Sequence, residues 1–363
     1  MNILYISHLT DAISEGPNYS VPAQIKAQSK YDSVFWWNLT SAKQQCWLDT
    51  GLFHGIEEYQ SKKISDLPKP FDKPDLVVFE SFYYVDDALL SRECRRRKIP
   101  YVVVPRSALT KQGQSRKRIK KLLANILLFK PMTKHASAIH YLTEKELSDS
   151  GKSWCKNAFV IGNGIERKPF KTKERGSVIR GVYIGRFEPV QKGLDLLLDA
   201  CVSCKKSMQE NNVVIELYGP KRYNCREEYR EQILQKDMGE LIKIREGVFG
   251  TEKQSVLENA DFFVMTSRFE GMPMSLIEAM SYGLPCLITD GTNMTDVVER
   301  FDAGWTARVD TNSISEALTR MIKDIPEFER KQQNAWELSK QYDWDAIASN
   351  THEKYEQLLM QRR

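Results

Sequence analysis

The chain has 363 residues, enough for two domains that each bury a core. Its hydrophobic share of 41% and charged share of 28% are ordinary for a soluble globular protein, and its net charge of +5 is too small for a dedicated nucleic-acid binder. The sequence opens without a signal-peptide pattern and contains no apolar run of the ~18 residues that a spanning helix needs, so we expect a cytoplasmic protein.

Short apolar runs predict a parallel sheet in the first half of the chain, at 2–7, 33–37, 76–79 and 101–104. The loop after the first run lies where doubly wound sheets bind ligands, and Gly16 in this loop permits close approach of the backbone. A helix is expected to begin at Pro22 with Ser20 as its cap. Trp36 and Trp37 could stack on a sugar, but adjacent aromatic residues in a strand are more often core, and we favour the core.

The segment 115–130 is the most basic helix-like part of the chain. Its apolar residues fall on one stripe at helical spacing, and cations crowd its first turns. The stripe contains Ile119, Leu122, Leu123, Ile126 and Leu127, and the basic end contains Arg116, Lys117, Arg118, Lys120 and Lys121. Two interpretations are equally supported. One is a core-packed helix with a solvated basic end, and the other is a surface for anionic lipid headgroups or a lipid-linked diphosphate, which Arg92 and residues 95–98 would extend.

Two more features belong to the first half. Arg106 follows the run 101–104, where a guanidinium directed into a ligand site would meet anionic groups of a donor or an acceptor. Thr143 and Glu146 form a capping-box pattern, which predicts a helix after the strand that ends at 139–140. A last strand is expected at 159–165, followed by a polar linker at 166–176.

A second sheet is predicted to start with a strand at 178–184, and a loop with two cations follows this strand. Gly185 permits a sharp turn, and Arg186 and Lys192 flank the loop before a helix that Gly193 opens. Two flexible cations beside a helix start suit a diphosphate, whereas the alternative is that both are simply solvated.

The CxxC pair, Cys201 and Cys204, extends the apolar face of that helix, and no second pair or nearby His completes a metal site. We therefore expect core cysteines, no metal and no cofactor. Another strand is expected at 213–218, and a helix after Val248 is expected to be capped by Thr251.

Residues 262–289 predict a βαβ unit with two carboxylates. Glu270 lies in the loop ahead of the helix and Glu278 inside the helix, with seven residues between them. Carboxylates only accept hydrogen bonds, so they suit neighbouring hydroxyls of a hexose or a ribose, and free N–H groups at 272–275 suit a phosphate. The alternative is that the helix dipole favours acids near the helix start and that a lone helical Glu is solvated.

The string FEGMPMSLIEAMSYGLP resembles the signature of the retaining glycosyltransferases of family four, which carry the Glu-x7-Glu motif before a Gly-x-Pro turn. GRFEPVQKGLDLLLDA is a second match to the family. The resemblance implies an α/β protein of the GT-B fold, with two Rossmann-like domains facing a central cleft. It implies an acceptor-binding domain at 1–165, a nucleotide-sugar-binding domain at 177–343, and a last helix at 344–363 that packs back on the first domain.

The chain departs from the family pattern at three places in its first half. Gly16-Pro17 replaces a Gly-Gly pair, Pro105-Arg106-Ser107 stands where the family often has His-Gly, and Gly162 replaces a proline. Proline has no N–H, so only Gly16 keeps the close approach that the pair provides.

The resemblance implies a hexosyltransferase-type enzyme that moves a sugar, with retention, from a nucleotide-diphospho-sugar to an acceptor hydroxyl. The expected acceptor is a lipid-linked glycan in surface polysaccharide assembly, with an anionic membrane surface as a further partner and no nucleic acid. The expected catalytic residues are Glu270, Arg186 and Lys192. The expected donor-binding residues are Glu278, Gly16, Gly185, Gly271, Met272, Pro273, Met274, Ser275, Val248 and Arg106. The alternatives are a sugar-nucleotide epimerase of similar fold and a nucleotide-sugar-binding protein without turnover.

Overall fold

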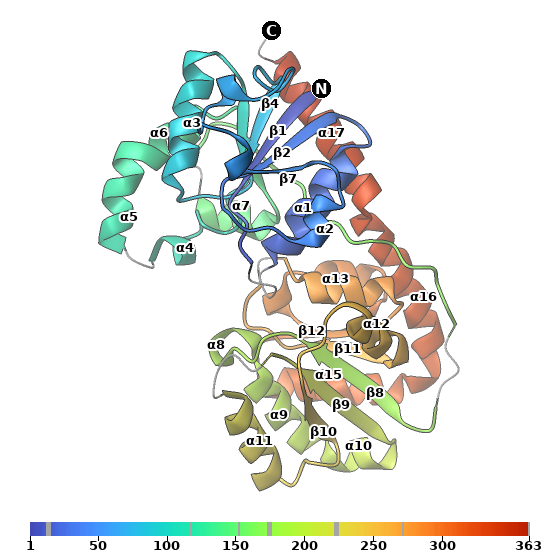
Figure 1. Ribbon diagram of the computed structural model, residues 1–363. Helices are drawn as coiled ribbons and strands as arrows, with labels where there is room; N and C mark the ends of the chain where they lie inside the picture. Colours follow the sequence, from blue (N-terminus) through green and yellow to red (C-terminus); the bar gives the residue numbers. More distant parts are fainter. Residues whose placement is uncertain are drawn as a thin grey trace. The chain divides into compact units, whose positions relative to one another are not determined.

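The computed structural model describes residues 1–361 except 12–15, 116–117, 152, 173–175, 221–224 and 271. The chain forms two compact units. The first unit contains Met1–Gly164 and Trp344–Arg363, and the second contains Ile165–Asp343. Each unit has one parallel sheet with helices on both faces (Figure 1), so the fold is two Rossmann-like α/β domains.

The sheet of the first unit has seven strands in the order β3-β2-β1-β4-β5-β6-β7, and the paired strands are parallel. Its strands are β1 (Asn2–Ser7), β2 (Ser33–Asn38), β3 (Phe53–Gly55), β4 (Leu76–Phe79), β5 (Tyr101–Val103), β6 (Ala138–Tyr141) and β7 (Ala158–Val160). The four strands expected early in the chain are confirmed within one residue at each end. The strand expected at 159–165 is shorter, because the chain leaves the sheet after Val160.

The helices of the first unit are α1 (Pro17–Gln28), α2 (Gln45–Leu48), α3 (Val85–Arg96), α4 (Lys111–Ser115), α5 (Arg118–Ala124), α6 (Lys130–Lys134), α7 (Glu144–Ser150) and α17 (Trp344–Met360). The expected start of the first helix at Pro22 is wrong, because α1 begins at Pro17 and Pro22 lies inside it. Pro22 has no N–H to offer the carbonyl of Asn18, and Trp47 Nε1 donates to that carbonyl at 3.1 Å instead. The helix therefore tolerates the internal proline.

The cap of α7 is partly as expected. The N–H of Glu146 donates to Thr143 Oγ1 at 3.1 Å, which confirms Thr143 as the cap. The carboxylate of Glu146 accepts from the N–H groups of Leu142 and Ser107 rather than from Thr143. The hydrogen bond from the Thr143 N–H to the Glu146 carboxylate, which would complete a capping box, is therefore absent from this cap. The carboxylate instead links the segments that contain Leu142 and Ser107.

The core-packed interpretation of the 115–130 segment is wrong for the side chains of its stripe that the structure describes. Between α5 and α6 the chain makes a π-helical turn, Asn125–Phe129, and Asn125 and Phe129 are buried. The side chains of Leu122, Leu123, Ile126 and Leu127 are 57–66% exposed. A π turn holds one more residue than an α turn, so a stripe drawn at constant α-helical spacing does not continue through it. Arg116 and Lys117 lie outside the described residues.

The two faces of the first sheet carry separate apolar clusters. Trp36 packs on one face and Trp37 on the other, both fully buried, which confirms the core interpretation. The long helix α17 covers one face beside α1 (Figure 1) and contributes Tyr355 to its cluster.

The second unit has a six-stranded parallel sheet in the order β10-β9-β8-β11-β12-β13. Its strands are β8 (Ile179–Ile184), β9 (Val213–Tyr218), β10 (Ile242–Arg245), β11 (Phe262–Met265), β12 (Cys286–Thr289) and β13 (Gly304–Ala307). Its helices are α8 (Pro189–Lys192), α9 (Leu194–Ser203), α10 (Lys205–Glu210), α11 (Cys225–Gln235), α12 (Gly250–Asn259), α13 (Met274–Ser281), α14 (Thr295–Arg300), α15 (Thr311–Lys323) and α16 (Phe328–Ser339). Cys201 and Cys204 are core residues, as expected.

The βαβ unit at 262–289 is confirmed, with Gly283 in the left-handed conformation (φ +71°) just after α13. The expected cap at Thr251 is wrong. The chain turns at Gly250, which has a φ of +53°, so α12 begins there and Thr251 lies inside it. No helix in the described part of the chain has the length and apolarity needed to cross a bilayer.

We expect Tyr355→Ala to lower the free energy of unfolding by about 3–5 kcal/mol, as for other large aromatic residues removed from a core. The matched control is Met360→Ala in the same helix, because Met360 is 66% exposed and should change stability by less than about 0.5 kcal/mol. Urea denaturation measures both. Equal effects of the two substitutions would show that α17 does not depend on its buried face.

Candidate active site

The candidate site lies at the carboxyl ends of β8 and β11 in the second unit. The strand order reverses direction between these two strands, and such a switch point leaves a crevice where open α/β sheets bind ligands. The loop 185–193 leaves β8, and the loop 266–273 leaves β11. The sheet topology therefore brings together the two loops that carry the predicted residues.

Glu270 and Lys192 meet across these loops. Glu270 Oε1 accepts from Lys192 Nζ at 2.7 Å and from Ser267 Oγ at 2.6 Å, and Oε2 accepts from Gln191 Nε2 at 3.2 Å. The side chain of Glu270 is only 8% exposed. A carboxylate with three donors at the rim of the crevice is held in one orientation, so it presents its remaining lone pairs at a fixed place.

A second bridge, which the sequence did not reveal, joins the loop after β11 to the first turn of α9, which directly follows the loop after β8. Arg268 donates twice to Asp195, at 2.9 and 2.6 Å, and its N–H donates to the carbonyl of Gln191 at 2.7 Å. Partial burial raises the pKa of Asp195, but the hydrogen bonds and charge of Arg268 outweigh it and hold that pKa below its usual value. The carboxylate therefore stays charged and keeps the bridge closed.

Two glycines let the loops approach closely. Gly193 has a φ of +61°, and a Cβ there would lie 2.0 Å from the carbonyl oxygen of Thr266. A Cβ at Gly291 would lie 2.2 Å from the carbonyl oxygen of Ser267. Only glycine fits either position. The contact at Gly193 sets the spacing between the loops that carry Lys192 and Glu270, and the contact at Gly291 packs the segment after β12 against the loop that carries Glu270.

Arg186 differs from Lys192 in its surroundings. The Tyr183 hydroxyl donates to the Arg186 carbonyl at 2.8 Å, and the Arg186 side chain is exposed. Burial raises the pKa of Tyr183 well above its usual value, so its hydroxyl keeps the proton that it donates. The backbone of Arg186 is anchored while its guanidinium extends into solvent.

Glu278 projects from α13 and pairs with Lys253 of α12 at 2.7 Å, with both side chains partly exposed. The lead-in to α13 contains half-buried Met272 and buried Pro273, and Met274 and Ser275 at the start of the helix are half-buried. Gly271 lies outside the described residues. A cation beside Glu278 is a feature that the sequence pattern did not indicate.

The backbone at the carboxyl ends of β8, β9 and β10 is tightly stacked. A Cβ at Gly219 would lie 2.4 Å from the Gly185 carbonyl oxygen, and one at Gly247 would lie 2.8 Å from the Pro220 nitrogen. The next residue, Val248, is buried. Because these positions are glycines, peptide groups rather than side chains form the surface at this end of the sheet. The sequence carries an indication of this close packing, because a glycine follows each of the three strands by one or two residues.

The first unit places Arg106 against an internal carboxylate. Arg106 Nη2 lies 2.7 Å from Glu80 Oε2, and the guanidinium also donates to Ser20 Oγ at 3.2 Å and to Gln24 Oε1 at 3.3 Å. Burial raises the pKa of Glu80, and the charge of Arg106 opposes this rise. Glu80 thus compensates the Arg106 charge. Gly16 is the exposed N-cap of α1, and a Cβ there would meet open space.

A buried His–Asp pair follows β1. His8 Nε2 lies 2.8 Å from Asp87 Oδ1, and the Tyr84 ring stacks on His8 at 3.7 Å. Burial raises the pKa of Asp87, while the hydrogen bond and charge of His8 lower it. The sequence pattern did not indicate this pair. The feature of the sequence that could have indicated it is a histidine directly after the first strand, at the carboxyl edge of the sheet.

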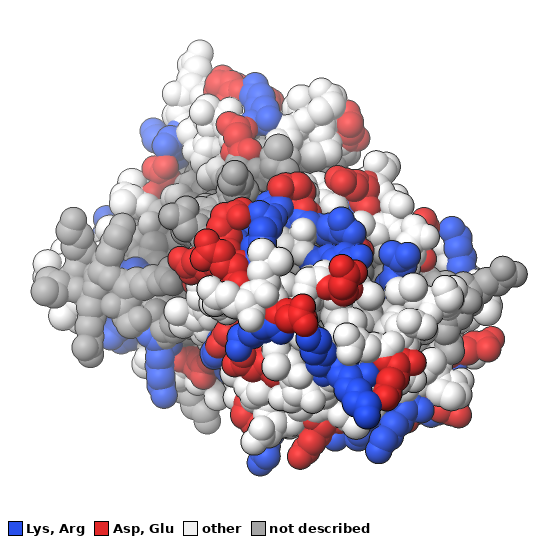
Figure 2. Space-filling view, turned by 90° about the horizontal axis from the view of Figure 1, so that it is seen from below, with Lys and Arg blue, Asp and Glu red and all other residues white. Residues whose placement is uncertain are grey.

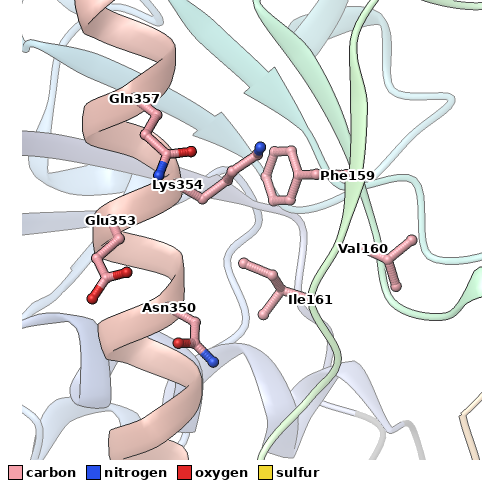
Figure 3. A pocket seen from close by; sticks show the side chains of 7 residues that line it. All are labelled: Phe159, Val160, Ile161, Asn350, Glu353, Lys354 and Gln357. Atoms are coloured by element: carbon pink, nitrogen blue, oxygen red, sulfur yellow. The ribbon is translucent and has the colours of Figure 1, made fainter.

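A hollow of about 230 Å³ lies between α17 and β7 (Figure 3). In the figure Lys354 extends toward Phe159, and its Nζ lies 5.8 Å from the centre of that ring. This hollow flanks the edge strand of the first sheet and not the carboxyl ends of its central strands, so we assign no ligand to it. The described residues contain no group of three His, Cys, Asp or Glu side chains placed to hold a metal.

The fold has solved counterparts. A structure of Anabaena HepE with UDP and glucose superimposes with a TM-score of 0.73 at 16% identity, over 98% of this chain and 100% of that one. Such a likeness establishes the fold alone. The protein has the GT-B fold, the architecture of two Rossmann-like domains.

Sequence comparison adds the enzyme class. Residues 179–324 match the family described as glycosyl transferases group 1. An uncharacterised glycosyltransferase of Methanocaldococcus jannaschii is 22% identical over 69% of this chain and 68% of its own length. The amylovoran biosynthesis glycosyltransferase of Erwinia amylovora is 26% identical over 45% of this chain and 41% of its own length. The protein is therefore a glycosyltransferase, and residues 179–324 of its second unit are similar to the group 1 family.

A shorter match concerns an enzyme with a named acceptor. The UDP-Gal:α-D-GlcNAc-diphosphoundecaprenol α-1,3-galactosyltransferase of Escherichia coli is 38% identical over 72 residues, which are 19% of this chain and 18% of that enzyme.

We expect Gly193→Ala to destabilise the protein by more than about 2 kcal/mol, because alanine is strained at positive φ and its methyl group would strike a backbone carbonyl. Gly239→Ala is the matched control, since its nearest neighbour lies 3.8 Å away, so its effect should stay within about 1 kcal/mol of zero. Urea denaturation compares the two. A neutral Gly193→Ala would show that the two loops are not fixed against each other.

Proposed function

We propose that this glycosyltransferase moves a sugar, with retention of anomeric configuration, from a nucleotide-diphospho-sugar to a hydroxyl of a lipid-linked glycan in surface polysaccharide assembly. The observation that carries the proposal is the Lys192–Glu270 bridge at the switch point of the second sheet, beside the exposed Arg186. A carboxylate and two cations together match a donor that combines sugar hydroxyls with a diphosphate.

In this proposal the donor lies along the carboxyl ends of β8 and β11. Glu270 accepts hydroxyls of the transferred sugar, Glu278 accepts the ribose hydroxyls, and peptide groups near Val248 contact the base. The Lys192 ammonium has three N–H donors, so it can keep its bond to Glu270 and still bind phosphate. The complexes of HepE with UDP and with UDP-glucose support a nucleotide sugar as donor.

The reaction breaks the bond from the anomeric carbon to the β-phosphate oxygen and forms a bond from that carbon to the acceptor oxygen. No pair of side chains in the described site serves as nucleophile plus acid, because the Glu270 carboxylate is bonded to Lys192, Ser267 and Gln191. We propose that the acceptor attacks from the face that the phosphate leaves, so that the departing phosphate takes the acceptor proton. Retention follows from this geometry.

The protein then contributes position and charge. The phosphate gains negative charge as its bond to the sugar breaks, so fixed cations bind it more tightly in the transition state than in the ground state. Arg186 and Lys192 are assigned to this role in place of a divalent metal, with Lys192 oriented by Glu270.

The first unit is proposed to hold the acceptor. The galactosyltransferase that acts on GlcNAc-diphosphoundecaprenol supports a glycan on a lipid diphosphate as the acceptor. The amylovoran biosynthesis glycosyltransferase supports a role in polysaccharide assembly. Such an acceptor places the enzyme at the inner face of the cell membrane.

The function is tested by supplying a nucleotide sugar first alone and then with a lipid-diphosphate-linked sugar. We expect a new glycoside only when both are present, and proton NMR should show the anomeric configuration of the donor in the product. Change of the donor without acceptor would favour an epimerase, and binding without either reaction would favour a protein without turnover. An inverted product would contradict the retaining mechanism.

We expect Arg186→Ala and Lys192→Ala each to lower kcat/KM by on the order of 10²-fold or more, as for the loss of one preorganised oxyanion donor. Lys206→Ala is the charge-matched control, because the Lys206 side chain is 89% exposed on α10 of the same unit. EDTA should leave the rate unchanged. Loss of activity with EDTA and recovery with magnesium, or wild-type turnover in both variants, would contradict the assignment of Arg186 and Lys192 to this role in place of a metal.

A further inference from the structure

The charges of the chain are unevenly distributed. Residues 94–143 contain 13 Lys and Arg and no Asp or Glu. Because the whole chain has 53 basic and 48 acidic residues, the remainder has 40 basic against 48 acidic side chains. The described part of the face in Figure 2 shows the two signs interspersed. A strongly positive segment in an otherwise negative chain indicates an anionic partner.

The same segment presents an apolar surface to solvent. We call Leu122, Leu123, Ile126 and Leu127 the apolar ridge. Phe129 of the same helical stretch is buried in the core of the first unit, and Ala124 and Leu128 pack against that core, so this stretch carries apolar side chains on its inner side as well as on its outer side. A helix that is apolar on both sides is normally buried. We therefore expect a binding partner to cover these four neighbouring exposed aliphatic side chains.

Cations border the apolar ridge. Arg92 Nη2 lies 3.5 Å from the carbonyl oxygen of Leu127, which joins α3 to the ridge. Arg92 and Arg96 of α3 and Lys130 and Lys134 of α6 are exposed, and we call these four residues the basic rim. Figure 1 shows α5 on the outer side of the unit, with α3 and α6 between it and the sheet.

Nearby acids do not cancel the basic rim. Glu93 of α3 is buried and accepts from Arg97 and from the N–H groups of Ile64 and Ser65. Asp86, in the first turn of the same helix, pairs with Lys62 at 2.7 Å. The charge that faces solvent beside the ridge is therefore positive.

We propose that the apolar ridge and basic rim dock the first unit on an anionic lipid bilayer. The ridge enters the boundary between headgroups and acyl chains, and the basic rim binds the lipid phosphates, as in helices that lie in a membrane interface. The proposal deepens the proposed function, because a lipid-linked acceptor lies at such a surface, but the binding itself requires no donor and no turnover.

The test is sedimentation with vesicles of phosphatidylcholine alone and of equal parts phosphatidylcholine and phosphatidylglycerol, without donor or acceptor. The wild type should bind the anionic vesicles and lose binding as salt rises. A variant with Leu122, Leu123, Ile126 and Leu127 all changed to Gln should bind at least about 100-fold more weakly, because each residue loses apolar area buried in lipid. Changing the four residues of the basic rim to Gln should weaken binding on the order of 100-fold, and only for anionic vesicles.

The controls separate folding, charge and function. Leu234→Gln, at a 67% exposed position of α11, and Lys206→Gln should keep wild-type vesicle binding. Every variant should retain the thermal stabilisation that a nucleotide sugar gives. Failure of the wild type to bind, or equal binding by the ridge variant, would overturn the proposal. A concentration-dependent dimer that the ridge variant abolishes would overturn it as well, because a second copy would then cover the ridge. If the enzyme binds vesicles but transfers no sugar, the result would support membrane docking and refute the proposed function.

Discussion

The ion pair between Lys192 and Glu270 is the interaction on which the candidate site depends. It joins the loop after β8 to the loop after β11, and the Arg268–Asp195 bridge and the backbone contact at Gly193 fix the same crossing. A partly buried carboxylate without a partner would carry a large desolvation cost, so each charge stabilises the other. The site is therefore assembled before any ligand arrives, which is the arrangement that electrostatic catalysis requires.

The first unit uses charge in a different way. At the carboxyl edge of its sheet, Arg106 and Glu80 compensate each other and His8 pairs with Asp87, so these groups set the shape of the edge and do not leave a cation exposed there. Uncompensated positive charge instead lies on the outer helices beside the apolar ridge. The unit thus has paired charges at the described part of this edge and an exposed apolar and basic surface on its outer helices.

The sequence predicted the strands well because buried parallel strands are uninterrupted apolar runs, such as 76–79 and 262–265. It also indicated Glu270 and Lys192 as one site, from their family motifs and their places after two strands. It could not indicate the Arg268–Asp195 or Arg106–Glu80 pairs, because these join residues that only the tertiary structure brings together. The π-helical turn at Asn125–Phe129 was equally hidden, since periodicity assumes constant helical spacing.

Amide hydrogen exchange shows whether the loops after β8 and β11 together form the donor site. The nucleotide sugar that raises the melting temperature most should slow exchange in peptides covering 185–193 and 266–278, and this protection should diminish in Lys192→Ala. Protection confined to another part of the second unit, or unchanged protection in the variant, would show that the donor does not bind at these two loops.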